Sequence, residues 1–143
     1  MANKALVYAI YPNEKQNIQC QKTFGCCRFV YNHMLSLQQD RYKNDEKHLN
    51  KKNANNYCNQ QFKEDYPFLK EVDKFALTNA IYHLEDGYDR FFKHLSKFPK
   101  YKSKHKVKKS YTTNFTNNNI EIGENFIKLP KLGVVKAKIH RKP

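Results

Sequence analysis

The hydrophobic pattern at the start of the chain predicts a strand followed by a helix. Residues 5–11 are apolar and aromatic, and this run stops at Pro12. Asn13 and Gln16 then have the spacing of a capping box, in which each side chain accepts a hydrogen bond from the other residue's backbone N–H. A helix is therefore expected to begin at Glu14.

Two longer stretches have the apolar spacing of amphipathic helices. In each, an apolar residue recurs every three or four positions, which keeps one helical face apolar. Asp73 precedes the second stretch and is suited to cap it. Residues 40–59, between the stretches, are polar and rich in asparagine, so we expect a loop and a short helix there. The two apolar faces consist of Cys20, Phe24, Cys27, Tyr31 and Met34, and of Leu77, Ile81, Leu84, Tyr88, Phe91 and Leu95.

The end of the chain changes to a strand pattern. Short apolar runs are separated by turns that contain Asn or Gly, at hairpin spacing. The N-terminal strand has no neighbour before this region, so the economical topology pairs it with the C-terminal strands. We therefore predict an α+β fold, in which residues 1–12 and 110–143 form a small antiparallel β-barrel and residues 13–109 form a helical insertion. The expected C-terminal strands cover residues 111–115, 120–122, 126–129 and 134–139.

Charge separates the last third of the chain from the rest. Residues 90–143 carry 15 basic and only 2 acidic side chains, while residues 1–89 carry 12 and 11. A net charge of +14 on 143 residues indicates a polyanionic partner. Aromatic residues make up 14% of the chain, and rings beside cations can stack on bases, which favours nucleic acid.

The basic excess is densest in residues 97–109, which contain seven lysines and no acidic residue. Pro99 and the absence of an apolar stripe argue against a packed helix, so we expect a solvated arm. Contacts of this arm with phosphates would add affinity without sequence choice, and a solubilising loop is the alternative. The residues expected to contact a nucleic-acid backbone are Lys97, Lys100, Tyr101, Lys102, Lys104, Lys106, Lys108 and Lys109, of which Tyr101 is also expected to stack on a base.

The cysteines and the apolar runs do not predict a metal site or a membrane span. Cys20, Cys26, Cys27 and Cys58 form no C-x-x-C pair, so buried free thiols are expected. No apolar run is long enough to span a membrane, and the N-terminus lacks the pattern of a signal peptide. These features predict a cytoplasmic protein without a membrane partner.

Six motifs follow one another along essentially the whole chain. The two longest are Thr-Phe-Gly-Cys-Cys-Arg-Phe-Val-Tyr-Asn-His at residues 23–33 and Ser-Tyr-Thr-Thr-Asn-Phe-Thr-Asn-Asn-Asn-Ile at residues 110–120. Together the motifs resemble the N-terminal region of TnpB, the family of transposon-encoded RNA-guided DNA endonucleases. The remaining four lie at residues 11–13, 69–77, 98–104 and 128–133.

The resemblance implies a fold and a set of partners. In that family this region is a barrel, called the wedge domain, interrupted by a helical recognition domain. The implied partners are guide RNA from the transposon end and double-stranded DNA, in a prokaryotic cytoplasm, with nucleoid association when bound. The family's RuvC-like nuclease and zinc ribbon follow this region, so no catalytic residue, metal or cofactor is expected in this chain.

The resemblance also implies which residues read the transposon-adjacent DNA motif. Lys74 and Thr78 are four positions apart, so they share a helical face outside the apolar stripe. Lys can donate to guanine, a Thr methyl can touch thymine, and Asn can form two hydrogen bonds with adenine. Relatives often carry Gln where this chain has Thr78, so the motif preference is expected to differ. The implied residues are Lys74, Thr78, Thr116, Asn117, Asn55 and Lys51; ordinary surface positions, and for Thr116 and Asn117 turn positions, are the alternatives.

Three functions are consistent with this sequence. The leading one is the recognition portion of a transposon-associated RNA-guided nuclease. The second is a stand-alone DNA-binding repressor derived from the family, and the third is a structural binder of transposon RNA. Co-purified nucleic acid would separate them, because structured RNA favours the first and third while duplex DNA bound without RNA favours the second.

Overall fold

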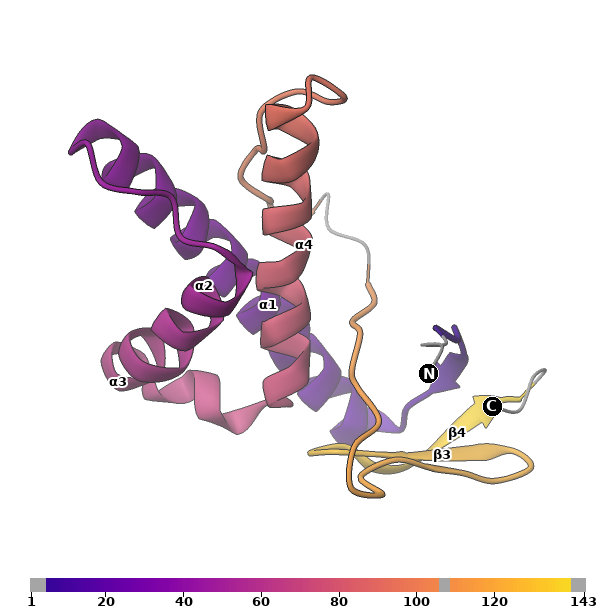
Figure 1. The fold of residues 1–143 in the computed structure, drawn as a ribbon. Coiled ribbons are helices and arrows are strands. Elements are labelled where there is room, and N and C mark those ends of the chain that lie inside the picture. The colour runs from indigo at the N-terminus through magenta and orange to yellow at the C-terminus, as the bar shows by residue number, and fades with distance from the viewer. Residues whose placement is uncertain (1–4, 106–108, 140–143) are drawn as a thin grey trace. The chain divides into compact units, whose positions relative to one another are not determined.

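The computed structural model describes residues 5–105 and 109–139 (Figure 1). Helices occupy the first two thirds of this described part, and strands lie at its two ends. In chain order the elements are β1 (Ala9–Tyr11), α1 (Glu14–Lys43), α2 (Lys51–Tyr57), the π-helical η1 (Cys58–Phe62), α3 (Lys63–Asp65), the 3-10 helix η2 (Pro67–Glu71), α4 (Lys74–Phe92), β2 (Glu121–Ile122), β3 (Phe126–Leu129) and β4 (Gly133–Lys138).

The chain forms two compact units. Met1–Gln21 and Asn114–Pro143 make up the sheet unit, and Lys22–Thr113 make up the helical unit. The α+β class is therefore confirmed. In the part of the chain that is described, no helix combines the length and the apolar character needed to cross a bilayer.

The start of α1 is fixed by the capping box that the sequence predicts. The backbone N–H of Gln16 donates to Asn13 Oδ1 at 2.8 Å, and the N–H of Asn13 donates to Gln16 Oε1 at 3.0 Å. Two N–H groups that the first helical turn would leave without a partner are thereby satisfied. Gln16 Nε2 also donates to the carbonyl of Val134 at 2.6 Å, which holds the first turn of α1 to β4 within the sheet unit.

The sheet is open, so the prediction of a closed barrel is wrong. Its strands are antiparallel in the order β1-β4-β3-β2, which leaves β1 and β2 as opposite edges among the described residues. Ile10 lies opposite Ala137, and Ile127 lies opposite Val135. Closing a sheet into a barrel requires the edge strands to meet, and four strands of two to six residues are too few and too short for that.

The expected strand at residues 111–115 does not form, because tertiary contacts hold its first residues in the helical unit. The ring of Tyr111 lies 6.1 Å from that of Phe24, measured between centroids. The carbonyl of Thr112 accepts a hydrogen bond from Asn79 Nδ2 at 3.0 Å. These contacts with α1 and α4 keep Tyr111 and Thr112 in the helical unit instead of the sheet.

The core of the helical unit lies where α1, α2 and α4 meet. As predicted, most of the α4 stripe is buried, from Leu77 at 1% exposure to Tyr88 at 3%. Leu95 is the exception at 72% exposure, because α4 ends at Phe92. The buried cluster consists of Cys26, Val30, Tyr31, Met34, Leu35, Ala54, Cys58, Phe62, Leu69, Val72, Leu77, Ile81, Leu84 and Tyr88.

The polar stretch after α1 contains a loop and the short helix α2, as expected, but the helical segment is longer than predicted. It continues from α2 through η1 and α3 to Asp65. Ala54, Cys58 and Phe62 recur at four-residue spacing and are all buried, and their burial supports the continuation. All four cysteines are free thiols, and Cys20, Cys26 and Cys58 are buried.

Candidate nucleic-acid interface

Three residues implied as motif readers lie along the contact between α2 and α4. Thr78 Oγ1 on α4 donates to Asn55 Oδ1 on α2 at 2.9 Å, and both side chains are partly buried. Lys74 lies one turn before Thr78 and is exposed, with its Nζ 5.2 Å from the ring of Phe75. The structure thus joins Thr78 and Asn55 directly and places Lys74 on the same side of α4. We call these three residues the α2–α4 edge.

Lys51 is differently placed, because its charge is paired. Its Nζ lies 2.5 Å from Asp86 Oδ1 and 5.6 Å from the ring centroid of Tyr82. The hydrogen bond to Asp86 raises the pKa of Lys51; burial opposes this increase, and the negative charge of Asp86 adds to it. Because Lys51 is already occupied by an acid of α4, it is less available to a phosphate than Lys74 is.

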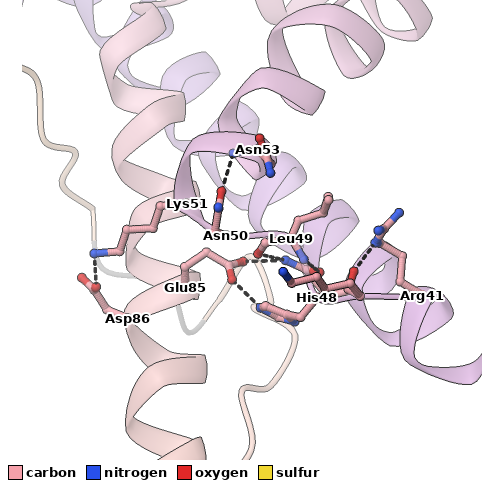
Figure 2. Close-up of polar contacts among 10 residues, drawn as sticks. Arg41, His48, Leu49, Asn50, Lys51, Asn53, Glu85 and Asp86 are labelled. Atoms are coloured by element: carbon pink, nitrogen blue, oxygen red, sulfur yellow. Dashed lines mark hydrogen bonds and ion pairs between the residues drawn. The ribbon is translucent and has the colours of Figure 1, made fainter. Parts of the chain in front are cut away.

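A buried polar network fixes where α2 begins. Glu85 of α4 is 4% exposed, and its carboxylate lies 2.7 Å from His48 Nε2 and 3.2 Å from Gln38 Nε2 (Figure 2). Gln38 also forms two hydrogen bonds with the backbone of Leu49, of 2.9 and 3.0 Å. Asn50 then caps α2 by accepting from the N–H of Asn53 at 2.8 Å (Figure 2). The network therefore sets the position from which Asn55 reaches Thr78.

Thr116 and Asn117 belong to a tight turn in the sheet unit. Asn117 and Asn118 both have positive φ, of 51° and 58°, and the N–H of Asn119 donates to the carbonyl of Thr116 at 3.0 Å. Two successive left-handed residues are typical of a type I′ turn, which favours Asn. The side chain of Asn119 also accepts from the N–H of Thr116 at 2.8 Å. Turn geometry therefore accounts for the asparagines at these positions, and contact with DNA stays a prediction.

Part of the basic segment is held against α1, so the prediction of a solvated arm is wrong for Tyr101 and Lys102. Asn32 forms two hydrogen bonds with the backbone of Lys102, of 2.8 and 2.9 Å. The hydroxyl of Tyr101 lies 2.8 Å from Ser36 Oγ and donates to Gln39 Oε1 at 3.2 Å. The Nζ of Lys102 lies over the Tyr31 ring, 4.3 Å from its centroid. Lys97, Lys100, Lys104 and Lys109 are exposed, while Lys106 and Lys108 lie outside the described residues.

This attachment creates a groove that sequence reasoning missed. The groove has a volume of about 590 Å³ and lies within the helical unit, between α1, α4 and the chain on both sides of residues 106–108. It brings Arg28, His83 and Tyr111 beside Lys100, Lys102 and Tyr101. Arg28 and Tyr111 lie within two of the six sequence motifs, but only the fold shows that they share a site.

Comparison with known proteins identifies the relatives of this chain. Residues 1–47 match the family model HTH_OrfB_IS605, which is described as a helix-turn-helix domain. Within the described part of that range the structure has β1 and the single 30-residue helix α1, rather than two helices joined by a turn. The match and the basic groove together indicate a nucleic-acid-binding protein.

Over about 75% of its length the chain is homologous to TnpB-like RNA-guided DNA endonucleases, which confirms the resemblance seen in the motifs. It is 32% identical over 108 residues to a protein of Streptomyces pristinaespiralis named "Putative RNA-guided DNA endonuclease", covering 75% of this chain and 27% of that one. InsQ of Escherichia coli K12, which carries the same description, is 24% identical over 102 residues, or 71% of this chain and 25% of InsQ. This chain thus spans about a quarter of the length of both.

A third relative is much shorter. "Virulence protein VsdF" of Salmonella dublin is 28% identical over 112 residues, which cover 71% of this chain and 94% of VsdF. The homology therefore covers about a quarter of two long endonucleases and nearly all of a short protein. The domain matched on this chain is the helix-turn-helix domain, and no catalytic domain is among the matches.

Proposed function

We propose that this chain is the nucleic-acid recognition portion of a TnpB-like RNA-guided nuclease and has no catalytic centre of its own. In this proposal it contacts guide RNA and the transposon-adjacent DNA motif. The observation that carries the proposal is the α2–α4 edge, where an exposed lysine adjoins the hydrogen-bonded pair Thr78 and Asn55. The homology to RNA-guided endonucleases supports assigning this polar edge to nucleic acid.

The pair of Thr78 and Asn55 has a chemical consequence for base reading. An Asn amide reads adenine by accepting from one base atom and donating to another. Thr78 uses one acceptor site of Asn55 Oδ1 and leaves the second one and the amide N–H groups available. Thr78 would thus orient the amide of Asn55 and make no base contact through its own hydroxyl. Lys74 would add a donor for guanine or for a phosphate.

The other parts of the chain have proposed roles in the same complex. Residues 1–12 and 110–143, which include the four strands, would form the wedge portion, and residues 13–109 the recognition portion. Thr116 and Asn117 would reach the DNA motif from the turn that they form with Asn118 and Asn119. The lysines of residues 97–109 would contact phosphates of the guide RNA, where contacts add affinity without selecting sequence.

One observation favours a second candidate, a stand-alone binding protein without nuclease activity. The match covers 94% of VsdF, so one homologue consists almost entirely of the matched region. A repressor that binds duplex DNA, or a protein that holds transposon RNA, would both be consistent with such a chain.

Recovery of bound nucleic acid separates these functions. The chain should be expressed together with a transposon-end transcript, purified, and its nucleic acid sequenced after separate RNase and DNase treatment. We expect structured transposon RNA to be retained and duplex DNA binding to depend on it. Duplex DNA bound without RNA would favour the repressor, and RNA bound without any effect on DNA would favour the structural RNA binder.

A further inference from the structure

The groove of the helical unit has the chemistry of a nucleotide site. Its volume of about 590 Å³ falls in the ~300–1,000 Å³ range of small-molecule sites. Three cations line it, namely Arg28, Lys100 and Lys102, and no acidic residue is among its described lining residues. None of these cations forms a salt bridge with a described residue. A concave surface with unpaired positive charge attracts phosphate.

Aromatic rings and polar groups complete the lining. Phe24 and Tyr111 lie with ring centroids 6.1 Å apart at 60°, and Tyr101 is 53% exposed. Ser103, Ser110 and Asn79 supply hydroxyl and amide groups. Rings are the surfaces on which unstacked bases pack, while hydroxyl and amide groups can hydrogen-bond to base edges.

The walls of the groove are fixed on both sides of residues 106–108. On one side, Asn32 holds the backbone of Lys102, and the hydroxyl of Tyr101 bonds to Ser36 and Gln39. On the other side, Asn79 donates to the carbonyl of Thr112. A preformed wall lowers the ordering cost of binding.

We propose that this groove binds one unstacked nucleotide of a single-stranded nucleic acid, with its phosphate at Arg28 and Lys100 and its base against the rings of Tyr111 and Phe24. A duplex keeps its bases stacked inside and cannot present one to these rings without unpairing. The groove therefore selects single strands, which is a property that the phosphate-binding role of the basic segment does not include. The assignment rests on the proposed nucleic-acid function and names a specific site for it.

His83 provides a probe inside the groove. Partial burial and the positive charges of Lys102 and Arg90 lower the pKa of His83, while Asp86 opposes them. A phosphate bound at Arg28 and Lys100 would add negative charge to the groove that His83 also lines, and so would raise the pKa of His83. This change can be followed by NMR titration of the ring signals of the full chain, assigned by comparison with His83→Gln.

The binding test uses the full chain and a fluorescein-labelled 12-nucleotide single-stranded RNA, with the duplex of the same sequence in parallel. Arg28→Gln should weaken binding of the single strand about tenfold, because a charge-assisted phosphate contact is lost. Lys43→Gln also removes one positive charge, but at the far end of α1, and should change affinity for the single strand less than threefold. Tyr111→Leu should also weaken binding of the single strand about tenfold. Tyr111→Phe should keep most of the wild-type affinity, because the ring that stacks on the base is retained.

The outcomes separate the site from the general function. The inference stands if Arg28→Gln loses more affinity for the single strand than Lys43→Gln does, if Tyr111→Phe binds better than Tyr111→Leu, and if only the single strand shifts the pKa of His83. It fails if the wild type binds RNA but Arg28→Gln and Lys43→Gln weaken binding equally, or if the duplex shifts His83 as much as the single strand does. A wild-type chain that binds no nucleic acid would refute the proposed function together with this site.

Discussion

The α2–α4 edge and the basic groove lie in the same unit but differ in their charge. Among the described residues the edge has one cation without a salt bridge, Lys74, while the groove has three. Beside the edge, Lys51 is paired with Asp86, and Asn55 is held by Thr78. In the groove, Arg28 and Lys100 have no acidic partner among the described residues. Compensated polar groups in fixed orientation suit the reading of base edges, while uncompensated cations suit the binding of phosphate. We therefore propose that the edge supplies sequence choice and the groove supplies affinity.

Metal-dependent cleavage would remove the basis of this comparison, because both regions are assigned to binding. Among the described residues no group of three His, Cys, Asp or Glu side chains could hold a metal ion. If the chain is a recognition portion without its own catalytic centre, as proposed, the purified chain with magnesium and guide RNA should leave supercoiled and linear DNA intact. The measurement is gel analysis after size-exclusion purification. Cleavage that co-elutes with the chain and requires magnesium would refute the proposal.

Cys27 tests the burial of a thiol that lines the groove. Burial raises the pKa of the Cys27 thiol to about 12 from 9.0, and the positive charge of Lys102 only partly opposes this. At pH 8 the thiolate fraction should be about 10³-fold lower than for an unshifted thiol. Because the raised pKa belongs to the folded state, its stabilising effect is present below pH 9 and is lost as pH rises toward 12.

Iodoacetamide labelling followed by mass spectrometry measures this protection. Cys27 should react slowly in the native chain and at an ordinary rate in urea, where burial is abolished. Rapid labelling of the native chain at pH 8 would mean that the groove cations lower the pKa of the Cys27 thiol more than burial raises it, and that the thiol is accessible to the reagent.

Charge in the basic segment should control affinity without controlling sequence. Replacing Lys100, Lys104, Lys106, Lys108 and Lys109 by Gln should weaken RNA and DNA binding alike, by about 10²–10³-fold, and lower the salt slope by about 4. Lys102 is kept because its Nζ lies over the Tyr31 ring. The same five positions changed to Arg are the matched control and should bind normally. A wild-type salt slope in the Gln variant would assign the segment to solvent.

The smallest effects are expected at the paired charge. Lys51→Gln should change affinity for duplex DNA less than threefold, because Asp86 already neutralises the ammonium group. Asp86→Asn should raise affinity about two- to fivefold by freeing Lys51. Fluorescence anisotropy with duplex DNA at 0.1 M salt can distinguish the affinities of the two variants. A large loss in Lys51→Gln would place Lys51 among the contact residues despite its partner.

The sequence predicted best what depends on neighbouring residues. The capping box of Asn13 and Gln16 was predicted from spacing alone, and β3 has its expected bounds, because both are local patterns. The barrel was wrong because the fate of residues 111–115 depends on Phe24 and Asn79, which are distant in sequence. The groove was missed for the same reason, since Arg28, His83 and Tyr111 meet only in the fold.

The candidate motif site shows the same limit. The resemblance implied Asn55 and Thr78 as separate contacts, but not that one holds the other across 23 residues of sequence. Spacing within α4 gave the shared face of Lys74 and Thr78, because four-residue separation fixes direction on a helix. No comparable local rule places α2 against α4, so the pairing required the tertiary structure.

Selection of preferred duplexes from a randomised library, with guide RNA present, tests the central claim that the α2–α4 edge reads sequence. The wild type should select a motif, and Lys74→Ala should relax one position by ~1–3 kcal/mol of discrimination. Thr78→Val, which keeps the shape but frees Asn55, should relax an adenine position, while Thr78→Gln should sharpen it. The account is contradicted if the wild type selects no motif, or if Lys74→Ala and Thr78→Val leave every position of the motif unchanged.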